Sequence, residues 1–268
     1  MKFMKLGGVF AVFSALGAAA FFCSCGSCPE WEDEWVTQDI VASRAAKDQI
    51  KIDGIVSPGE WDDAQDYQLA RAQNWGYGSM PPRRRAKVDQ VPFERGYFKV
   101  KYDDDFLYVL GSFKDSDLVQ TVRKDQEMSF RTGDTAEVFL KPEAKNAFWE
   151  IHGTPWSCAT TLFYPWIGYS HNGQQTTLHE GIRTAAAVDG TLNNGEGEDF
   201  GWTVEMAIPR VLIEKTGEKF EPGKEWRILL CRYNYGGNLP LPQISSTPRL
   251  PKTNHHLTEY YGKLKFKE

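Results

Sequence analysis

The stretch that decides the fold is Gly201-Trp202-Thr203-Val204-Glu205-Met206-Ala207-Ile208-Pro209. Large apolar side chains stand at every second position, and Thr203 and Glu205 stand between them. This period of two is typical of a β-strand with one face in a core, because successive side chains of a strand point to opposite faces. We therefore predict a strand over Gly201–Ile208, with Glu205 on an outward face as a solvated or cross-strand-paired acid. The predicted core side chains are Trp202, Val204, Met206 and Ile208.

Similar patterns flank this strand on both sides. Gly96–Tyr102 and Phe106–Phe113 enclose the polar turn Asp103–Asp105 and predict a hairpin. Further predicted strands, separated by Gly, Pro and Asn, are Thr135–Leu140, Phe148–His152, Ala159–Phe163, Ile182–Val188, Trp226–Tyr233 and Gly262–Phe266. Helical patterns are confined to Pro209–Lys215 and Ser57–Ala64. The chain is thus predicted to be all-β: a single β-sandwich of two antiparallel sheets, immunoglobulin-like or jelly-roll-like in layout, with one or two short helices.

The first 28 residues predict an export signal. Met1–Lys5 carries two lysines, and Leu6–Phe22 is an unbroken run of apolar and small residues. The run is at the lower limit for a membrane-spanning helix and no basic stop-transfer sequence follows it, so we expect cleavage. Cys25 is the candidate for lipidation, and ordinary cleavage after Ala20 or Ser27 is the alternative. The mature chain is then a lipoprotein of the cell envelope or outer membrane, or else secreted or periplasmic.

Composition and charge restrict the remaining possibilities. Residues 29–40 are an acidic tether, and residues 41–268 contain no repeat or linker, so they are expected to be one domain. With 31 Lys and Arg against 36 Asp and Glu, the net charge of −5 excludes a basic nucleic-acid-binding protein. Cys158 and Cys231 either pair or remain two buried thiols. We expect a monomer that contacts a membrane only through its lipid anchor.

Aromatic residues are in excess, with 9 Trp, 11 Tyr and 16 Phe. The segment Trp156–Tyr169 is especially rich in them, and Pro165 and Gly168 interrupt it. It is interpreted either as a loop whose rings form a ligand platform or as a hydrophobic cluster under a long loop. The same two alternatives apply to Trp75.

Six short motifs follow one another along residues 41–268. They are Ile52-Asp53-Gly54; Gly59-Glu60-Trp61 with Ala64; Tyr102-Asp103 with Leu107-Tyr108-Val109; Gly133-Asp134 with Glu137-Val138-Phe139-Leu140; the stretch 201–209; and Tyr261-Gly262-Lys263-Leu264. This succession resembles the family 9 carbohydrate-binding modules and their DOMON-like relatives. The resemblance implies a β-sandwich that binds sugar between aromatic side chains and has no catalytic machinery. Asp53-Gly54 is expected to form a turn, and Trp61 and Ala64 to pack the first segment onto the sandwich.

The resemblance also implies where the sugar binds. One stacking aromatic of the family matches Phe130, with Arg131 beside it, and the second falls at Asn254-His255-His256, where this chain has no tryptophan. An imidazole offers a smaller stacking face, so either the sugar differs from the glucan and xylan ligands of the family or the sandwich geometry is lost. Because sugars bind to flat apolar faces and planar polar groups, further candidates are Trp149, Glu150, His152, Trp156, Tyr164, Trp166, Tyr169 and Trp75. Arg232 and Asn234 either reach the ligand or form a surface pair.

The sequence therefore predicts non-catalytic binding of an oligo- or polysaccharide, in polysaccharide capture or breakdown. Two alternatives stay open. Some DOMON-like domains hold a b-type haem for electron transfer, and His152 or His255 with Met128 or Met206 would supply its axial ligands. The other alternative is an accessory part of a glycoside hydrolase system, for which the acids in well-defined strands are Glu137, Glu150 and Glu205.

Other chemistry has weak signals. The histidines show no close metal-ligand spacing, so no zinc site is predicted. They are His152, His171, His179, His255 and His256. The acidic turns Asp103–Asp105 and Glu196–Asp199 are either solvated or hold structural calcium, which the family often contains. Arg83–Arg85 is interpreted as a solvated loop.

Overall fold

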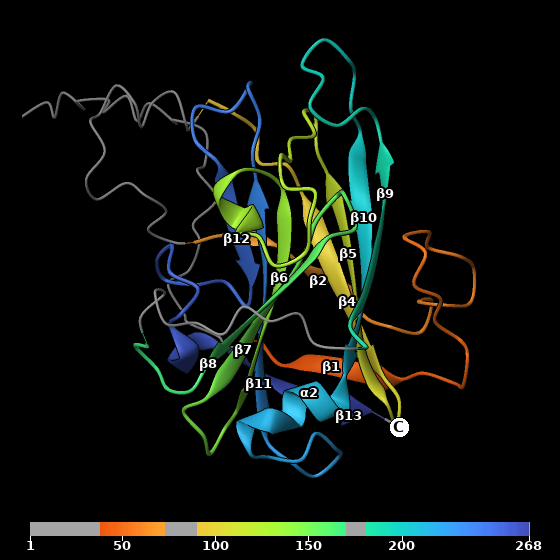
Figure 1. Ribbon diagram of the computed structural model, residues 1–268, viewed down its shortest axis with the longest axis vertical. Helices are drawn as coiled ribbons and strands as arrows, with labels where there is room; N and C mark the ends of the chain where they lie inside the picture. Colours follow the sequence, from red (N-terminus) through yellow and green to blue (C-terminus); the bar gives the residue numbers. More distant parts are fainter. Residues whose placement is uncertain (1–37, 73–89, 170–180, 268) are drawn as a thin grey trace, which may run out of the picture. The chain divides into compact units, whose positions relative to one another are not determined.

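Strands make up nearly all the regular structure of the computed structural model, which describes residues 38–72, 90–169 and 181–267 (Figure 1). The strands are β1 (Ile40–Arg44), β2 (Tyr67–Gln68), β3 (Ala70–Arg71), β4 (Gly96–Tyr102), β5 (Phe106–Lys114), β6 (Thr135–Pro142), β7 (Phe148–Gly153), β8 (Ala159–Tyr164), β9 (Arg183–Asp189), β10 (Gly201–Pro209), β11 (Trp226–Asn234), β12 (Gln243–Thr247) and β13 (Gly262–Lys267). The short helical segments are α2 (Arg210–Ile213), η2 (Ser129–Arg131), η4 (Glu214–Thr216) and η5 (Thr258–Tyr260). Within these ranges, no helix has the length and apolarity of a membrane span.

All the strands that alternation predicts are present, with bounds that differ by one or two residues at most. The helix expected over Pro209–Lys215 forms as α2 and η4, and Gly217 ends it with a left-handed φ of 87°. The helix expected over Ser57–Ala64 is wrong, since this segment consists of turns. The Ser57 and Trp61 carbonyls each accept a hydrogen bond three residues on, and no helical ladder follows.

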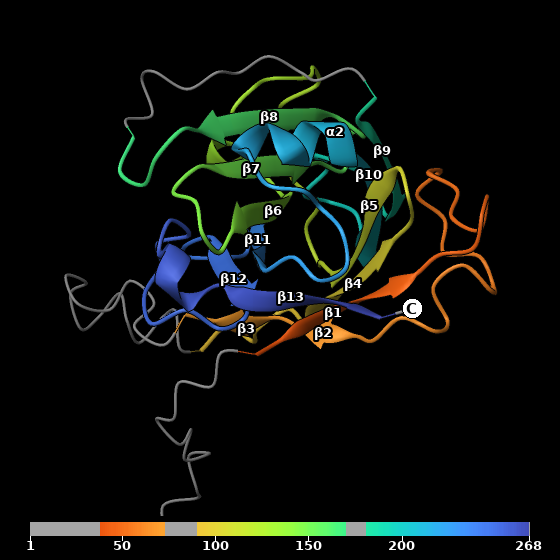
Figure 2. The ribbon, with the colours of Figure 1, turned by 90° about the horizontal axis from the view of Figure 1, so that it is seen from below.

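The all-β prediction is confirmed, but the strands form one mixed, nearly closed sheet where two purely antiparallel sheets were predicted. Ten of the strands follow one another in the order β8-β7-β6-β11-β13-β1-β4-β5-β10-β9, whereas β12 pairs with β11 and β3, and β2 pairs with β4. β1 pairs in parallel with both β13 and β4, and it thereby joins the two halves of the fold. Figure 2 shows the strands following one another around the core, with α2 across one end. The halves also meet near the free edges, where the Ala186 N–H donates to Ser157 Oγ at 2.9 Å.

The main core lies between these two halves. One half contributes Val138, Ile151 and Leu230, and the other contributes Val100 and Val109 among others. The alternating apolar side chains of β10 are at most 2% exposed, which confirms their predicted place in the core; they are Trp202, Val204, Met206 and Ile208. Each buries a large apolar surface, worth about 1.5–3 kcal/mol per side chain.

Glu205 lies on the face of β10 away from the main core, as predicted, but it is fully buried and bonded to the N-terminal segment, so the prediction of a solvated or cross-strand-paired acid is wrong. Its Oε2 accepts the backbone N–H groups of Asp53, at 3.2 Å, and Gly54, at 3.0 Å. Its Oε1 accepts the indole N–H of Trp61 at 2.9 Å. Asp53, Gly54 and Trp61 thus cover this face of β10, and the Glu205 carboxylate holds them there. Burial raises the pKa of Glu205, although these three hydrogen bonds act in the opposite direction.

This N-terminal segment packs as expected for Trp61 and Ala64. Both belong to a second cluster with Ala45, Ile50, Tyr108, Leu110 and Ala207. Gly54 makes the predicted turn with a φ of 81°, and a Cβ there would lie 2.5 Å from the carbonyl carbon of Ala186. Glycine is therefore required both for the conformation and for the close approach to β9.

A third cluster covers the outer face of β6, β7, β8 and β11. Its members are Phe139, Phe148, Leu162, Tyr164, Leu229, Cys231, Leu250 and Tyr261. Cys231 is a free thiol, as is the buried Cys158, so these two do not form a disulfide in the structure. Leu250 and Tyr261 come from the segment that crosses this face before β13. β6 is consequently buried on both faces.

Candidate functional site

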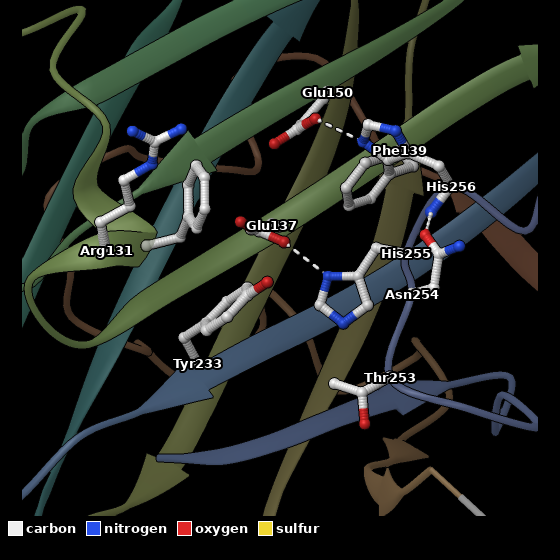
Figure 3. A pocket seen from close by; sticks show the side chains of 10 residues that line it. Arg131, Glu137, Phe139, Glu150, Tyr233, Thr253, Asn254, His255 and His256 are labelled. Atoms are coloured by element: carbon white, nitrogen blue, oxygen red, sulfur yellow. Dashed lines mark hydrogen bonds and ion pairs between the residues drawn. The ribbon is translucent and has the colours of Figure 1, made fainter. Parts of the chain in front are cut away.

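A pocket of about 230 Å³ lies on this outer face (Figure 3). Its floor consists of side chains from β6, β7 and β11, and η2 and the segment before η5 provide its walls. The lining residues are Phe130, Arg131, Glu137, Phe139, Glu150, Tyr233, Thr253, Asn254, His255 and His256. Segments that are distant in the sequence thus meet at one concave site.

Strand register explains the polar floor. In β6, Ala136 and Val138 face the main core, so Glu137 faces the pocket side. Glu137 is directly opposite His152 of β7 and, on its other side, Cys231 of β11. Pairing between these strands therefore sets one carboxylate between an imidazole and a thiol.

Two carboxylates and three imidazoles form one network. Glu137 Oε2 lies 2.9 Å from His255 Nδ1, and Glu137 Oε1 lies 3.3 Å from His152 Nε2. The same His152 nitrogen lies 2.8 Å from Glu150 Oε1. Glu150 Oε2 lies 3.2 Å from His256 Nε2 and accepts the Tyr164 hydroxyl at 2.7 Å. Figure 3 shows the contacts of His255 and His256 with the two acids.

Burial and hydrogen bonds shift the pKa values of the two acids, His152 and His255 in different directions. Burial raises the pKa of Glu137 to about 8. Burial acts in the same direction on Glu150, but hydrogen bonds from His152 and His256 outweigh it and hold the pKa of Glu150 well below its usual range. Burial lowers the pKa of His255 to about 4, which leaves its ring neutral. For His152, burial is outweighed by the two carboxylates, and the pKa is raised.

An imidazole lies against both carboxyl groups of the pocket floor. One oxygen of Glu137 and one of Glu150 lie within 4.8 Å of each other, and His152 Nε2 lies within that distance of both. Retaining glycosidases separate their carboxyl groups by about 5–5.5 Å and inverting ones by about 6.5–9.5 Å, with the sugar between them. Here an imidazole occupies the place that a glycosidic bond would need.

Five of the predicted binding residues line the pocket. Phe130 and Arg131 come from η2, Glu150 from β7, and His255 and His256 from the segment before η5. The family resemblance had assigned Phe130, Arg131, His255 and His256 to the sugar site. Glu150 was a candidate for its planar polar group.

Two more predicted residues lie directly behind the floor. His152 is fully buried, with Nδ1 3.3 Å from Ser129 Oγ. Tyr164 stacks on Phe148 with ring centroids 4.3 Å apart, and its hydroxyl donates to Glu150.

The other predicted aromatics lie elsewhere. Trp149 is in the main core against Phe163, on the opposite face of β7 from Glu150. Trp156 donates its indole N–H to the Gln120 carbonyl at 2.8 Å, and Arg123 lies 4.3 Å above its ring. Trp75 is outside the described residues, as are Cys25, Arg83–Arg85, His171 and His179.

The middle of the aromatic segment Trp156–Tyr169 is strand β8, so the segment is not one open loop. Tyr164 and Tyr169 pack in the third cluster, as the alternative of a hydrophobic cluster proposed. Trp166 is 54% exposed and meets Tyr169 edge to face at 4.6 Å. Of the ring platform predicted in this segment, the structure thus leaves Trp166 as the exposed indole.

Arg232 and Asn234 are neither pocket residues nor a surface pair, because both are 1% exposed. Arg232 forms an ion pair with Asp115 at 2.8 Å. Asn234 donates its Nδ2–H to Glu94 at 2.7 Å. Both side chains connect β11 to residues that flank β4 and β5.

The positions of the other candidate ligands are also set by the fold. Met206 is in the main core, whereas His152 faces the other side of the sheet, so these two do not form a haem-ligand pair.

The carboxylates of the two acidic turns bind backbone N–H groups. Asp103 accepts the N–H groups of Asp105 and Phe106. Asp199 accepts the N–H groups of Leu118 and Thr191.

Sequence reasoning missed three lining residues. Phe139 and Tyr233 stand at alternate positions of predicted strands, and Thr253 precedes the predicted Asn254-His255-His256. Phe139 could have been recognised because it is a large apolar residue between Val138 and Leu140, which face the core. An apolar residue at such a position indicates that the second face of β6 is also covered. Nothing in the sequence indicated that this face borders a pocket.

Solved structures share this fold. A protein from Bacteroides uniformis described as a "putative carbohydrate-binding protein" matches with a TM-score of 0.63 at 13% identity, over 86% of this chain and 99% of that one. A family 9 carbohydrate-binding module from Caldicellulosiruptor kristjanssonii in complex with cellotriose matches with a TM-score of 0.54 at 15% identity, over 86% and 94% of the two chains. A family 9 module from the same organism in complex with glucose gives 0.51 at 15% identity, over 86% and 96%.

No family model and no curated protein matches the chain. At these identities the likeness shows the fold alone. It is the fold that the resemblance to family 9 modules implies, and none of these three structures is described as a DOMON-like domain.

Proposed function

We propose that this protein binds carbohydrate without catalysis, and that the sugar occupies the pocket between η2 and the segment before η5. One observation carries the proposal. Phe130 with Arg131, and His255 with His256, are distant in sequence yet line the same pocket. These are the two places where the resemblance to family 9 modules expects the side chains that enclose the sugar.

The lining has the chemistry that a sugar ring requires. Phe130, Phe139 and Tyr233 offer apolar faces for C–H groups. Arg131 and Asn254 are exposed at the rim and offer planar donors for hydroxyl groups. Aromatic faces beside a few directed polar groups are the usual make-up of a small-molecule site.

The size of the pocket favours one sugar residue at a chain end. Its volume of about 230 Å³ is below the roughly 300–1,000 Å³ of sites for drug-sized ligands. The similar family 9 structures contain cellotriose and glucose. We infer that a terminal sugar enters this pocket and that the rest of an oligosaccharide extends over the rim.

Calorimetric titration with mono- and oligosaccharides chosen from a glycan array tests the proposal. Phe130→Ala should weaken binding roughly 10-fold, because an aromatic contact is worth about 0.5–1.5 kcal/mol beyond area. Phe200→Ala is the matched control, since Phe200 is 57% exposed and does not line the pocket. Trp166→Ala should also leave binding unchanged. The proposal fails if the folded protein binds no glycan, or if only Trp166→Ala abolishes binding.

The non-catalytic part has its own test. Prolonged incubation with a bound oligosaccharide should release no reducing sugar. Release that disappears in Glu150→Gln would instead establish a hydrolase.

Export and lipid anchoring complete the proposal. The basic start, the apolar run and Cys25 support a lipoprotein signal. Expressed in a bacterial host, the protein should incorporate labelled palmitate and partition into detergent, and Cys25→Ser should abolish both. Unchanged labelling in Cys25→Ser would contradict the assignment of this cysteine.

A further inference from the structure

Three side chains on two neighbouring strands point their coordinating atoms at one another beneath the pocket. They are Glu137 of β6 with Glu150 and His152 of β7, and their ligand atoms all lie within 4.8 Å of one another. All three are at least 95% buried, with exposures of 1%, 4% and 0%. Two buried carboxyl groups that face one imidazole nitrogen are stabilised by a proton or a metal ion between them.

We propose that Glu137, Glu150 and His152 bind one first-row divalent metal ion of the zinc class. Imidazole nitrogen and carboxylate oxygen are ligands of such ions, whereas Ca²⁺ and Mg²⁺ prefer oxygen alone. Ligands about 2.0–2.2 Å from a tetrahedral ion lie about 3.3–3.6 Å apart. His152 Nε2 is 3.3 Å from Glu137 Oε1 and 2.8 Å from Glu150 Oε1, so small side-chain shifts suffice.

The groups around these ligands are already oriented for coordination. His152 Nδ1 is 3.3 Å from Ser129 Oγ, which fixes the ring with Nε2 toward the acids. Glu137 Oε2 contacts His255 Nδ1 at 2.9 Å, and Glu150 Oε2 accepts the Tyr164 hydroxyl at 2.7 Å. Metal-binding histidines and carboxylates have such outer partners in most proteins.

The site is open toward the pocket. Glu137 and Glu150 line it, whereas His152 lies behind them, so the remaining coordination positions face the cavity. Three protein ligands with an accessible fourth position are typical of zinc sites that bind an exchangeable ligand.

A competing set consists of Glu137, Cys231 and His255, whose ligand atoms also lie within 4.8 Å of one another. Cys231 belongs to the apolar cluster beneath the pocket and does not line it. Glu137 and His255 line the pocket as well, so the competing set differs from the proposed one in its thiol ligand and not in its access to the cavity. The absence of close histidine spacing in the sequence does not bear on either set, because strand pairing brings the ligands together.

Metal binding is measured directly, without any sugar, so the outcome is independent of the proposed carbohydrate binding. The protein is treated with a chelator and titrated with Zn²⁺ by calorimetry. We expect one ion per chain, and Ca²⁺ should not compete. Glu137→Gln and His152→Gln should each weaken Zn²⁺ binding by at least about 100-fold, since loss of mere outer partners already costs about 10–100-fold. Glu143→Gln, an acid in the ion pair with Arg227, is the matched control and should bind normally.

A measurement on the unaltered protein guards against variants that fail to fold. Zinc-edge X-ray absorption of the loaded protein should show nitrogen and oxygen ligands and no sulfur, and Cys231→Ser should retain full affinity. Sulfur in the first shell would overturn the proposal in favour of the competing set. Absence of stoichiometric binding, or unchanged affinity in both ligand variants, would overturn it altogether.

Discussion

Replacement of Glu205 by glutamine tests how the N-terminal segment is held on the sheet. The carboxylate accepts three N–H groups, two at Oε2 from Asp53 and Gly54 and one at Oε1 from Trp61. Glutamine has the same shape but a single acceptor oxygen. In either orientation of the amide, its NH₂ group faces a buried N–H group, and at least one donor loses its partner.

The expected cost follows from these contacts. A lost hydrogen bond is worth about 0.5–1.5 kcal/mol, and a buried donor without a partner costs about 1–3 kcal/mol. Glu205→Gln should therefore destabilise the protein by about 1–3 kcal/mol. Glu205→Leu removes the acceptors for all three donors and should cost about 3–6 kcal/mol, a large part of a typical stability of about 5–15 kcal/mol.

Equilibrium unfolding in urea, followed by tryptophan fluorescence, measures these differences. Glu198→Gln is the control, because this exposed acid lies in a surface turn and should change stability by less than about 0.5 kcal/mol. Hydrogen exchange adds a local readout, since the amides of Asp53 and Gly54 should lose protection in the glutamine variant. A cost below about 0.5 kcal/mol for Glu205→Gln, or equal costs for both Glu205 variants, would refute the reasoning.

Three further predictions concern stability and reactivity. Gly133→Ala should cost about 1–3 kcal/mol in thermal or urea unfolding, since its Cβ would lie 2.2 Å from a carbonyl oxygen; an unchanged midpoint would contradict this. Burial raises the pKa of Asp115 to about 6, and it also raises the pKa of Asp134. Both acids interact electrostatically with Arg232. The folded state then holds protons that the unfolded chain releases near pH 3.8, so the free energy of unfolding should fall as pH rises from about 4 to 6, and Asp115 alone should contribute up to about 3 kcal/mol of this fall. Asp115→Asn should flatten that slope. Cys231 should react with a thiol reagent only on unfolding, and rapid labelling of the native protein would contradict its burial.

Much of the sheet was predictable because its strands have one face in a strongly apolar core. In β10 every second residue is large and apolar, and this pattern alone located the strand. The two-residue strands β2 and β3 are too short to show a period. The parallel pairing of β1 with β4 and β13 depends on which strands are adjacent, and alternation within one strand contains no such information.

Glu205 shows why a polar residue between apolar ones is ambiguous. The pattern indicates correctly that its side chain leaves the main core. It does not indicate that Trp61 and the turn at Gly54 cover the opposite face. The covering segment is distant in sequence, so the burial of Glu205 is a tertiary property.

The candidate site is also a product of tertiary packing. It suggests a structural feature by which such sites can be recognised. β6 and β7 are buried along both faces, yet their outer faces include Glu137, Glu150 and His152. Burying such groups is costly unless they are paired, so a doubly covered strand gains nothing in stability from them over apolar residues. Each of these groups instead has a partner from a neighbouring strand, and Glu137 has a further one in His255. Polar side chains that persist on a strand covered on both sides therefore indicate a site, and here they indicate the same place as the pocket.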